Sequence, residues 1–129
     1  MDTYTLMCSK LEELQREWEP KEGDRYHYWM SKESEGTGFL DRKDIEDTDN
    51  PGMLAYDLDW LPTLDQLVEM MPKDFSYTLE YSGVAEEWIV RVGQNGFVTE
   101  HDEIKIALLQ ALAWSKWGKE WDSEKGEWK

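Results

Sequence analysis

The stretch FSYTLEYSGVAEEWIVRVGQNGFVT, residues 75–99, decides the fold. Apolar and polar residues alternate in two runs, Phe75–Tyr81 and Trp88–Val92, which is the pattern of half-buried strands. The run Gly93–Gly96 contains Asn-Gly, a pair that tolerates positive φ in a hairpin turn, and Phe97–Thr99 supplies a short returning strand. We therefore predict an antiparallel meander.

A helix is expected before this meander. Thr63 and Gln66 form a possible capping box at its start, and Pro72 stops it. Its apolar residues follow the i, i+3, i+4, i+7 spacing of one helix face: Leu64, Leu67, Val68 and Met71.

A second helix is expected after the meander, over about Asp102–Trp117. This segment is apolar nearly all round, which predicts a helix covered on more than one side, and Gly118 suits its C-terminal end. The charged C-terminal tail at about 119–129 contains Trp121 and Trp128. It either folds back on the core or lies open as a binding strip.

The N-terminal segment predicts another amphipathic helix. Ser9 and Glu12 are placed as a possible capping box, and Pro20 lies beyond the end. One apolar stripe runs along the expected helix through Met7, Leu11, Leu14 and Trp18.

Two further strands are expected in the N-terminal half. The aromatic run Arg25–Met30 favours a short strand, and the alternating run Leu54–Trp60 favours a half-buried strand that pairs with it. Between them Gly, Ser, Thr and acidic residues predict an irregular, exposed acidic loop at about 31–52.

The fold class that follows is α+β, with a small antiparallel β-sheet packed against two or three α-helices. The 129 residues match the commonest size of one domain, so we predict a single domain over 1–129. The eight tryptophans can bury a large apolar area, and we place Trp88 in the core.

The lone cysteine, Cys8, and the absence of a signal-peptide pattern at the N-terminus predict a cytoplasmic protein.

Charge narrows the classes of partner. The chain has 29 acidic and 14 basic residues and a net charge of −15. This charge opposes binding to nucleic acid and to anionic lipid, and no apolar run approaches the roughly 20 residues of a membrane span. We therefore expect a basic protein as partner, without direct nucleic-acid or membrane binding.

Catalytic patterns are scarce. His27 and His101 lack the close third ligand of a zinc site, and Cys8 lacks the setting that activates a nucleophile. No phosphate-binding glycine motif and no nucleophile elbow is present, and a Ca²⁺ loop beginning at Asp47 would place Leu58 where a bidentate Glu is needed. Two carboxylates can catalyse glycoside hydrolysis, but with 29 acidic residues any pair can be imagined, so the sequence singles out no such pair. We predict no enzyme, no cofactor and no metal.

Carboxylates spaced like phosphates can instead occupy the cationic groove of a nucleic-acid-handling protein. The alternative is that the acidic residues only keep an aromatic-rich domain soluble. The candidate partner-binding residues are Asp41, Asp44, Glu46, Asp47, Asp49, Asp57, Asp59, Glu100, Asp102 and Glu103.

The chain resembles a family of small acidic phage and prophage proteins of Firmicutes. Four segments carry this resemblance: Lys21–Asp24, Trp60–Met70, Ala111–Asp122 and Gly126–Trp128. That family carries a W-L-P-x-x-D-Q-L helix and a closing K-x-G-K-x-W-D segment. The resemblance implies a phage protein acting in the cytoplasm of the host cell, and it implies no activity common to the family.

A second similarity bears on function. The order of the expected elements resembles that of small type II-A anti-CRISPR proteins. The segments concerned are Lys73–Leu79, Ile89–Val92, Asn95-Gly96 and the last helix with its flanking acidic residues. This resemblance implies an inhibitor whose carboxylates bind the arginines with which an RNA-guided nuclease reads DNA. Two other functions stay open: a phage structural or assembly accessory protein, and a small-ligand binding module that uses exposed tryptophans.

Overall fold

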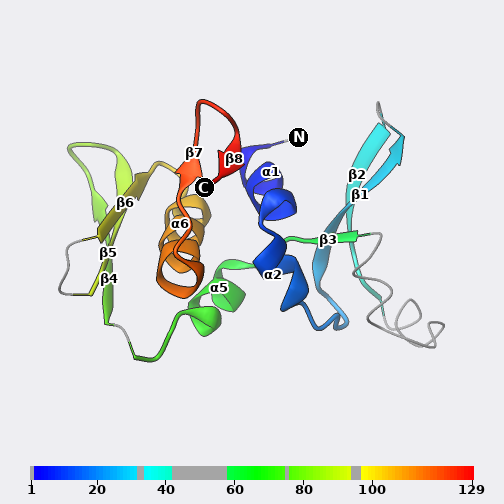
Figure 1. The fold of residues 1–129 in the computed structure, drawn as a ribbon, viewed down its shortest axis with the longest axis horizontal. Helices are drawn as coiled ribbons and strands as arrows, with labels where there is room; N and C mark the ends of the chain where they lie inside the picture. Colours follow the sequence, from blue (N-terminus) through cyan, green and yellow to red (C-terminus); the bar gives the residue numbers. More distant parts are fainter. Residues whose placement is uncertain (1, 32–33, 42–57, 75, 94–96) are drawn as a thin grey trace. The chain divides into compact units, whose positions relative to one another are not determined.

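The computed structural model describes residues 2–31, 34–41, 58–74, 76–93 and 97–129. Helices and small antiparallel sheets make up these residues, which confirms the predicted α+β class (Figure 1). The chain forms two compact units, Met1–Pro62 and Thr63–Lys129, which we describe one at a time. None of the described helices has both the length and the apolar character needed to cross a membrane.

The N-terminal unit begins with two short helices, α1 (Thr3–Lys10) and α2 (Glu12–Arg16). The prediction of one continuous helix is wrong, because the backbone leaves the helical region at Leu11, where φ is −93° and ψ is 87°. The four residues of the predicted apolar stripe are nevertheless all buried: Met7, Leu11, Leu14 and Trp18.

The start of the first helix also differs from the prediction. Ser9 and Glu12 do not form a cap at the beginning of a helix; instead Asp2 caps α1, and its carboxylate accepts a hydrogen bond of 2.7 Å from the Thr5 amide. The break between α1 and α2 is bridged by Gln15, whose Nε2 donates to the Cys8 carbonyl at 2.9 Å. The Cys8 carbonyl also accepts from the Leu11 amide at 3.2 Å, so Gln15 adds a second bond at the end of α1.

The N-terminal sheet contains β1 (Arg25–Ser31), β2 (Ser34–Phe39) and β3 (Leu58–Trp60) in the order β2-β1-β3. The predicted strand β1 and its antiparallel pairing with β3 are confirmed. The prediction of an irregular loop from residue 31 is wrong for β2, and residues 42–57 lie outside the described part of the chain.

Two glycines give β2 its place beside β1. Gly36 and Gly38 are the register partners of Tyr28 and Tyr26. A Cβ atom on Gly38 would lie 2.8 Å from Tyr26 Oη, and one on Gly36 would run into the ring of Tyr28. The tyrosine rings therefore occupy the space that side chains would fill at these two positions.

Tryptophans close the core of the N-terminal unit. The rings of Trp18 and Trp60 stack with centroids 6.3 Å apart and planes 5° from parallel. Trp18 Nε1 donates to the buried carboxylate of Asp24 at 2.9 Å, which also accepts from the Lys21 amide at 2.9 Å. The turn before β1 requires a positive φ of 90° at residue 23, and glycine adopts that conformation without strain.

The C-terminal unit begins with α5 (Leu64–Met70), where the predicted capping box of Thr63 and Gln66 is confirmed. Then follow β4 (Tyr77–Ser82), β5 (Glu87–Val92) and β6 (Phe97–His101), which pair antiparallel in the order β4-β5-β6. The predicted meander is thus confirmed. We call it the C-terminal sheet.

The long helix α6 (Ile104–Trp117) packs against β5, β6 and α5, as its all-round apolar sequence predicts. It ends at Gly118, which has the left-handed conformation with φ 65°. The Phe97 ring stacks on Trp114 at 4.1 Å, and Thr99 Oγ1 donates to the Ala107 carbonyl at 2.7 Å. Each large side chain fully buried here contributes roughly 1.5–3 kcal/mol to stability.

The charged tail forms a small hairpin of β7 (Trp121–Asp122) and β8 (Glu127–Trp128). The two tryptophans are register partners, and their half-buried rings meet edge to face at 5.2 Å. They pack on each other across the hairpin.

The core placement predicted for Trp88 requires correction. Val90 and Val92 on the same sheet face are fully buried, but Trp88 is half-buried at the end of that face. Its ring packs against Tyr81 with centroids 5.1 Å apart.

Candidate functional site

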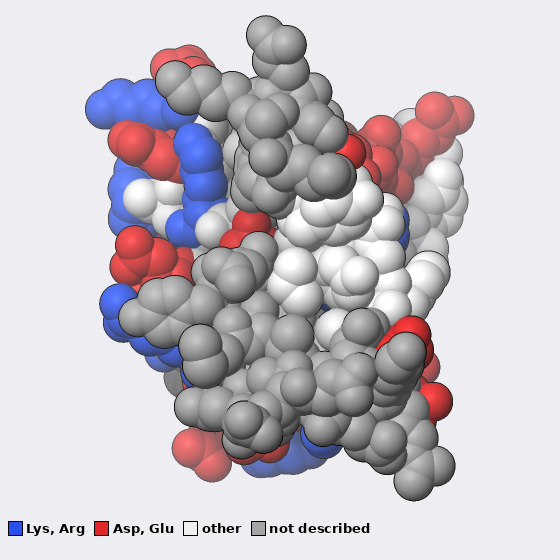
Figure 2. Space-filling view, turned by 90° about the vertical axis from the view of Figure 1, so that its right-hand side faces the viewer, with Lys and Arg blue, Asp and Glu red and all other residues white. Residues whose placement is uncertain are grey.

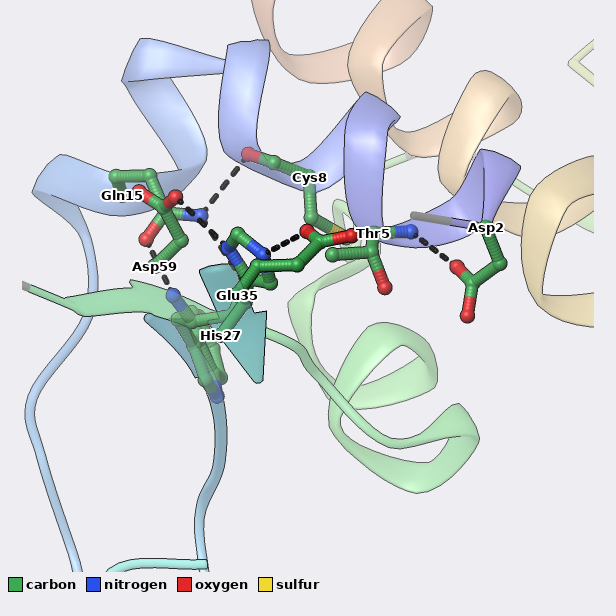
Figure 3. Close-up of polar contacts among 8 residues, drawn as sticks. Asp2, Thr5, Cys8, Gln15, His27, Glu35 and Asp59 are labelled. Carbon is green, nitrogen blue, oxygen red and sulfur yellow. Dashed lines mark hydrogen bonds and ion pairs between the residues drawn. The ribbon is translucent and has the colours of Figure 1, made fainter. Parts of the chain in front are cut away.

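A polar site of the N-terminal unit is built around the buried His27, in the middle strand β1. The imidazole is 2% exposed, and its two nitrogens face carboxylates from the two neighbouring strands (Figure 3). Nε2 lies 2.6 Å from Glu35 Oε2 on β2, and Nδ1 lies 3.6 Å from Asp59 Oδ2 on β3. We call these three residues the histidine cluster.

Strand register explains this arrangement. Asp59 is the Cα partner of His27 on one side, and Thr37 is its partner on the other. Glu35 lies two residues from Thr37, so it faces the same side of the sheet and reaches His27 diagonally. An ionised carboxylate only accepts hydrogen bonds, so Nε2 is the donor to Glu35.

A pocket of about 190 Å³ lies beside the histidine cluster. The start of α1 and the strands β1 and β2 supply its walls, and Figure 3 shows Asp2 and Thr5 on the side of Glu35. Its lining residues are Asp2, Thr5, His27, Glu35, Gly36 and Thr37.

A buried histidine held by carboxylates can orient a proton or hold a metal ion. Within the described ranges, no group of three or more His, Cys, Asp and Glu residues could hold a metal ion. The nearby thiol of Cys8 is fully buried, so it is not placed to meet a substrate in solvent. What the geometry does support is a link between β1 and β2 through the 2.6 Å hydrogen bond of His27 with Glu35, while His27 Nδ1 is buried near Asp59 without a hydrogen bond to it.

Sequence reasoning treated His27 as an isolated strand residue and therefore missed the histidine cluster. The pairing of the strands around His27 and Asp59 was predicted and could have placed these two side by side. Glu35 could not be added, because its segment was interpreted as a loop.

The predicted acidic partner-binding residues of the N-terminal half have different environments. Asp41 is exposed just after β2, whereas Asp59 is 27% exposed and belongs to the histidine cluster. The assignment of Asp41 and Asp59 to partner binding stays a prediction. The others lie outside the described residues: Asp44, Glu46, Asp47, Asp49 and Asp57.

The three predicted residues of the C-terminal half are brought together. Glu100 lies in β6, Asp102 follows that strand and Glu103 is the N-cap residue of α6, and all three are exposed. Asp102 Oδ1 lies 2.8 Å from His101 Nδ1, with 74% of the Asp102 side chain exposed.

The C-terminal sheet adds acidic residues that were not predicted as part of this surface. On the face that carries Glu100, register places Glu80 and Glu100 on either side of Ile89, and Glu87 lies two residues before Ile89 on β5. The one basic residue among the described positions of this face, Arg91, pairs with Glu80 at 3.1 Å. We call Glu80, Glu87, Glu100, Asp102 and Glu103 the acidic surface.

Figure 2 shows a face of the molecule on which both signs of charge are present. Described acidic and basic side chains are interleaved along one edge, next to an uncharged area. The described part of this face is therefore not uniformly acidic.

Tryptophan exposure bears on the alternative of a ligand-binding module. The large apolar residues found exposed in the described chain are Phe39, Val68, Tyr81 and Val84, and they include no tryptophan. The described tryptophans thus do not form an open binding strip.

Comparisons of this chain with protein-family models, curated proteins and solved structures found no match. The resemblances to phage proteins and to anti-CRISPR proteins therefore stay predictions.

Proposed function

We propose that the protein is a non-enzymatic inhibitor that binds a basic, nucleic-acid-handling protein with carboxylates in place of phosphates. The observation that carries this proposal is the acidic surface. Its carboxylates are held by a three-stranded sheet and the start of α6, and Arg91 is the one basic residue among the described positions of its sheet face.

A sheet is a suitable support for such mimicry. Neighbouring strands are about 4.8 Å apart, so Glu80 and Glu100, two strands apart, are separated by about 10 Å along the sheet. The sheet already fixes the backbone that carries these carboxylates, so only their side chains are ordered when the partner arrives, which limits the entropic cost of binding. Excess negative charge also steers a cationic groove toward the protein and speeds association.

More specifically, we propose that the protein is an anti-CRISPR protein encoded by a phage and acting in the host cytoplasm. The partner is then an RNA-guided nuclease, and the acidic surface binds the arginines that read the short duplex motif beside the target. Arginine forms two parallel hydrogen bonds with a carboxylate as it does with a phosphate, which makes this substitution chemically sound.

The test compares two triple variants that each remove three negative charges. The first is Glu100→Gln, Asp102→Asn, Glu103→Gln in the acidic surface. The control is Glu12→Gln, Glu19→Gln, Glu22→Gln, at exposed positions of the N-terminal unit. The measurements are affinity for a type II-A nuclease loaded with guide RNA, and inhibition of its DNA cleavage at two salt concentrations.

We expect the first variant to bind roughly tenfold more weakly, because three ion pairs of about 0.5 kcal/mol each are lost. The control variant should change affinity by less than about twofold. Equal losses in both variants would show that only net charge matters. Undiminished inhibition by the first variant would remove the acidic surface from the binding site.

A further inference from the structure

A row of three rings crosses one end of the C-terminal sheet. Trp88 on β5 is the register partner of both Tyr81 on β4 and His101 on β6, so the three side chains project from the same face. The Tyr81 and Trp88 rings are tilted by 56° with centroids 5.1 Å apart. We call these three residues the aromatic row.

The aromatic row is the open end of an otherwise covered face. Further along that face Val90 and Val92 are fully buried, and Phe97 stacks on Trp114 of α6. At the row itself, in contrast, Tyr81 is 54% exposed and the His101 side chain is 32% exposed. Partly exposed Tyr and Trp are the residue types that most often dominate binding energy at protein interfaces.

The turn between β4 and β5 lies beside the aromatic row, and its Ser82 hydroxyl accepts a hydrogen bond from the Ala85 amide at 3.2 Å. Val84 at the tip of the β4–β5 turn is fully exposed. Glu86 in the same turn has a φ of 56°, a conformation that residues other than glycine adopt infrequently and at some cost in energy. An apolar tip and a strained acidic residue therefore adjoin the open rings.

Charge indicates what this surface can bind. Asp102 contacts His101 at one end of the aromatic row, and Glu103 follows it. Partly exposed rings near carboxylates suit a cation that is flat, weakly hydrated and able to donate several hydrogen bonds. The guanidinium group of arginine has all three properties, whereas the lysine ammonium is a strongly hydrated point charge.

We propose that the aromatic row binds an arginine side chain of the basic partner, with the guanidinium stacked on the exposed ring of Tyr81 beside Trp88 and attracted by the carboxylates of Asp102 and Glu103. This inference rests on the proposed function and adds a residue-specific contact to it. Glu80, Glu87 and Glu100 project from the opposite face of the sheet, so Asp102 and Glu103 are the acidic residues that attract the partner to the aromatic row. The aromatic row itself distinguishes arginine from lysine.

The test uses octa-arginine and octa-lysine peptides as probes, with amide and indole NMR shifts as the readout. The variants are Tyr81→Ala, Tyr81→Phe and, as a control for loss of an exposed ring elsewhere, Phe39→Ala, since Phe39 is 69% exposed. The Trp88 indole signal is assigned by its absence in Trp88→Phe.

We expect octa-arginine to shift the Trp88 indole signal and to bind about threefold more weakly to Tyr81→Ala. Tyr81→Phe and Phe39→Ala should bind it like the unchanged protein, and octa-lysine should be insensitive to all three variants. Equal weakening of both peptides by Tyr81→Ala, or no weakening of either, would overturn the inference.

The two proposals fail in different ways. Neutralising Glu100, Asp102 and Glu103 could abolish nuclease inhibition while Tyr81→Ala binds octa-arginine normally. In that case the proposed function stands, and the aromatic row is excluded as an arginine-binding site. If Tyr81→Ala loses selectivity for arginine while the charge-neutralised protein still inhibits, the acidic surface is excluded instead.

Discussion

Tyr4 shows how one buried polar group is balanced in the N-terminal unit. Its side chain is 5% exposed, and its hydroxyl donates to the Pro62 carbonyl at 2.6 Å. Burial, and then the neighbouring Cys8, raises the pKa of this phenol above its ordinary value of about 10. Because the folded-state pKa is the higher one, the contribution to stability is complete below about pH 10 and is lost as the pH rises further.

We therefore expect Tyr4→Phe to lower the free energy of unfolding by about 1–2 kcal/mol at pH 7, since the buried Pro62 carbonyl loses its donor. The variant should also lose less stability above about pH 10 than the unchanged protein. Urea denaturation at a series of pH values measures both effects. An alkaline loss of the same size in the two proteins would contradict this assignment to Tyr4.

A second prediction at the residue scale concerns Gly36. A methyl group there meets the Tyr28 ring, so we expect Gly36→Ala to cost about 1–2 kcal/mol. With Tyr28→Ala already present, the same substitution should cost little, because the obstructing ring is gone. Gly83→Ala is the control, since nothing lies within 4 Å of its added Cβ. Additive effects of Gly36→Ala and Tyr28→Ala would show that the ring does not lie over Gly36.

At the scale of single elements, the sequence identified those that depend on local signals. The capping box of Thr63 and Gln66 lies within one helical turn, and α5 was predicted with its start and its stop. The break at Leu11 was not predicted, because the Gln15 side chain that bridges it also binds Trp60, 45 residues away. No local pattern contains a contact of that kind.

Strand β2 was not predicted, and the reason is again a contact with another part of the chain. Gly36 and Gly38 are ordinary signals of a loop, and only the rings of Tyr28 and Tyr26 on the neighbouring strand explain them in a strand. Losing β2 from the prediction also removed Glu35 from the histidine cluster. One missed strand thus concealed the candidate site.

Gln15 provides the prediction at this scale. Its amide donates to the Cys8 and Trp60 carbonyls at 2.9 and 3.1 Å and accepts from the Trp60 amide at 2.6 Å. We expect Gln15→Ala to lower the free energy of unfolding by roughly 2–3 kcal/mol, because the Trp60 amide and carbonyl lose the Gln15 side chain and the Cys8 carbonyl is left with the Leu11 amide. Gln110→Ala, at a half-buried position of α6, should cost less than about 1 kcal/mol. Equal costs in a thermal or urea melt would refute a bridging role for Gln15.

At the scale of the whole molecule, net charge was readable from the sequence, but its distribution was not. Three of the predicted residues, Glu100, Asp102 and Glu103, are brought together because β6 runs directly into α6. Glu80 and Glu87 join them only through strand register, which a list of residues does not contain. The position of Asp59 beside His27 likewise depends on the pairing of two strands.

The net charge of −15 has opposite effects on folding and on binding, and salt separates them. Salt shortens the Debye length from about 30 Å at 0.01 M to about 8 Å at 0.15 M, which screens repulsion between the acidic residues of the folded chain. We expect the melting temperature to rise by roughly 3–6 °C between 10 mM and 150 mM NaCl, equivalent to about 1 kcal/mol. The Glu12→Gln, Glu19→Gln, Glu22→Gln variant should show a smaller rise, because it carries less repulsion.

Affinity for a basic partner should fall over the same range of salt, because the attraction is screened as well. Loss of binding therefore cannot be attributed to unfolding if the melting temperature rises meanwhile. Differential scanning calorimetry and binding titrations at matched salt concentrations test the pair. A melting temperature that falls with salt would mean that attractive ion pairs outweigh repulsion in the fold, and an affinity independent of salt would contradict recognition through the acidic surface.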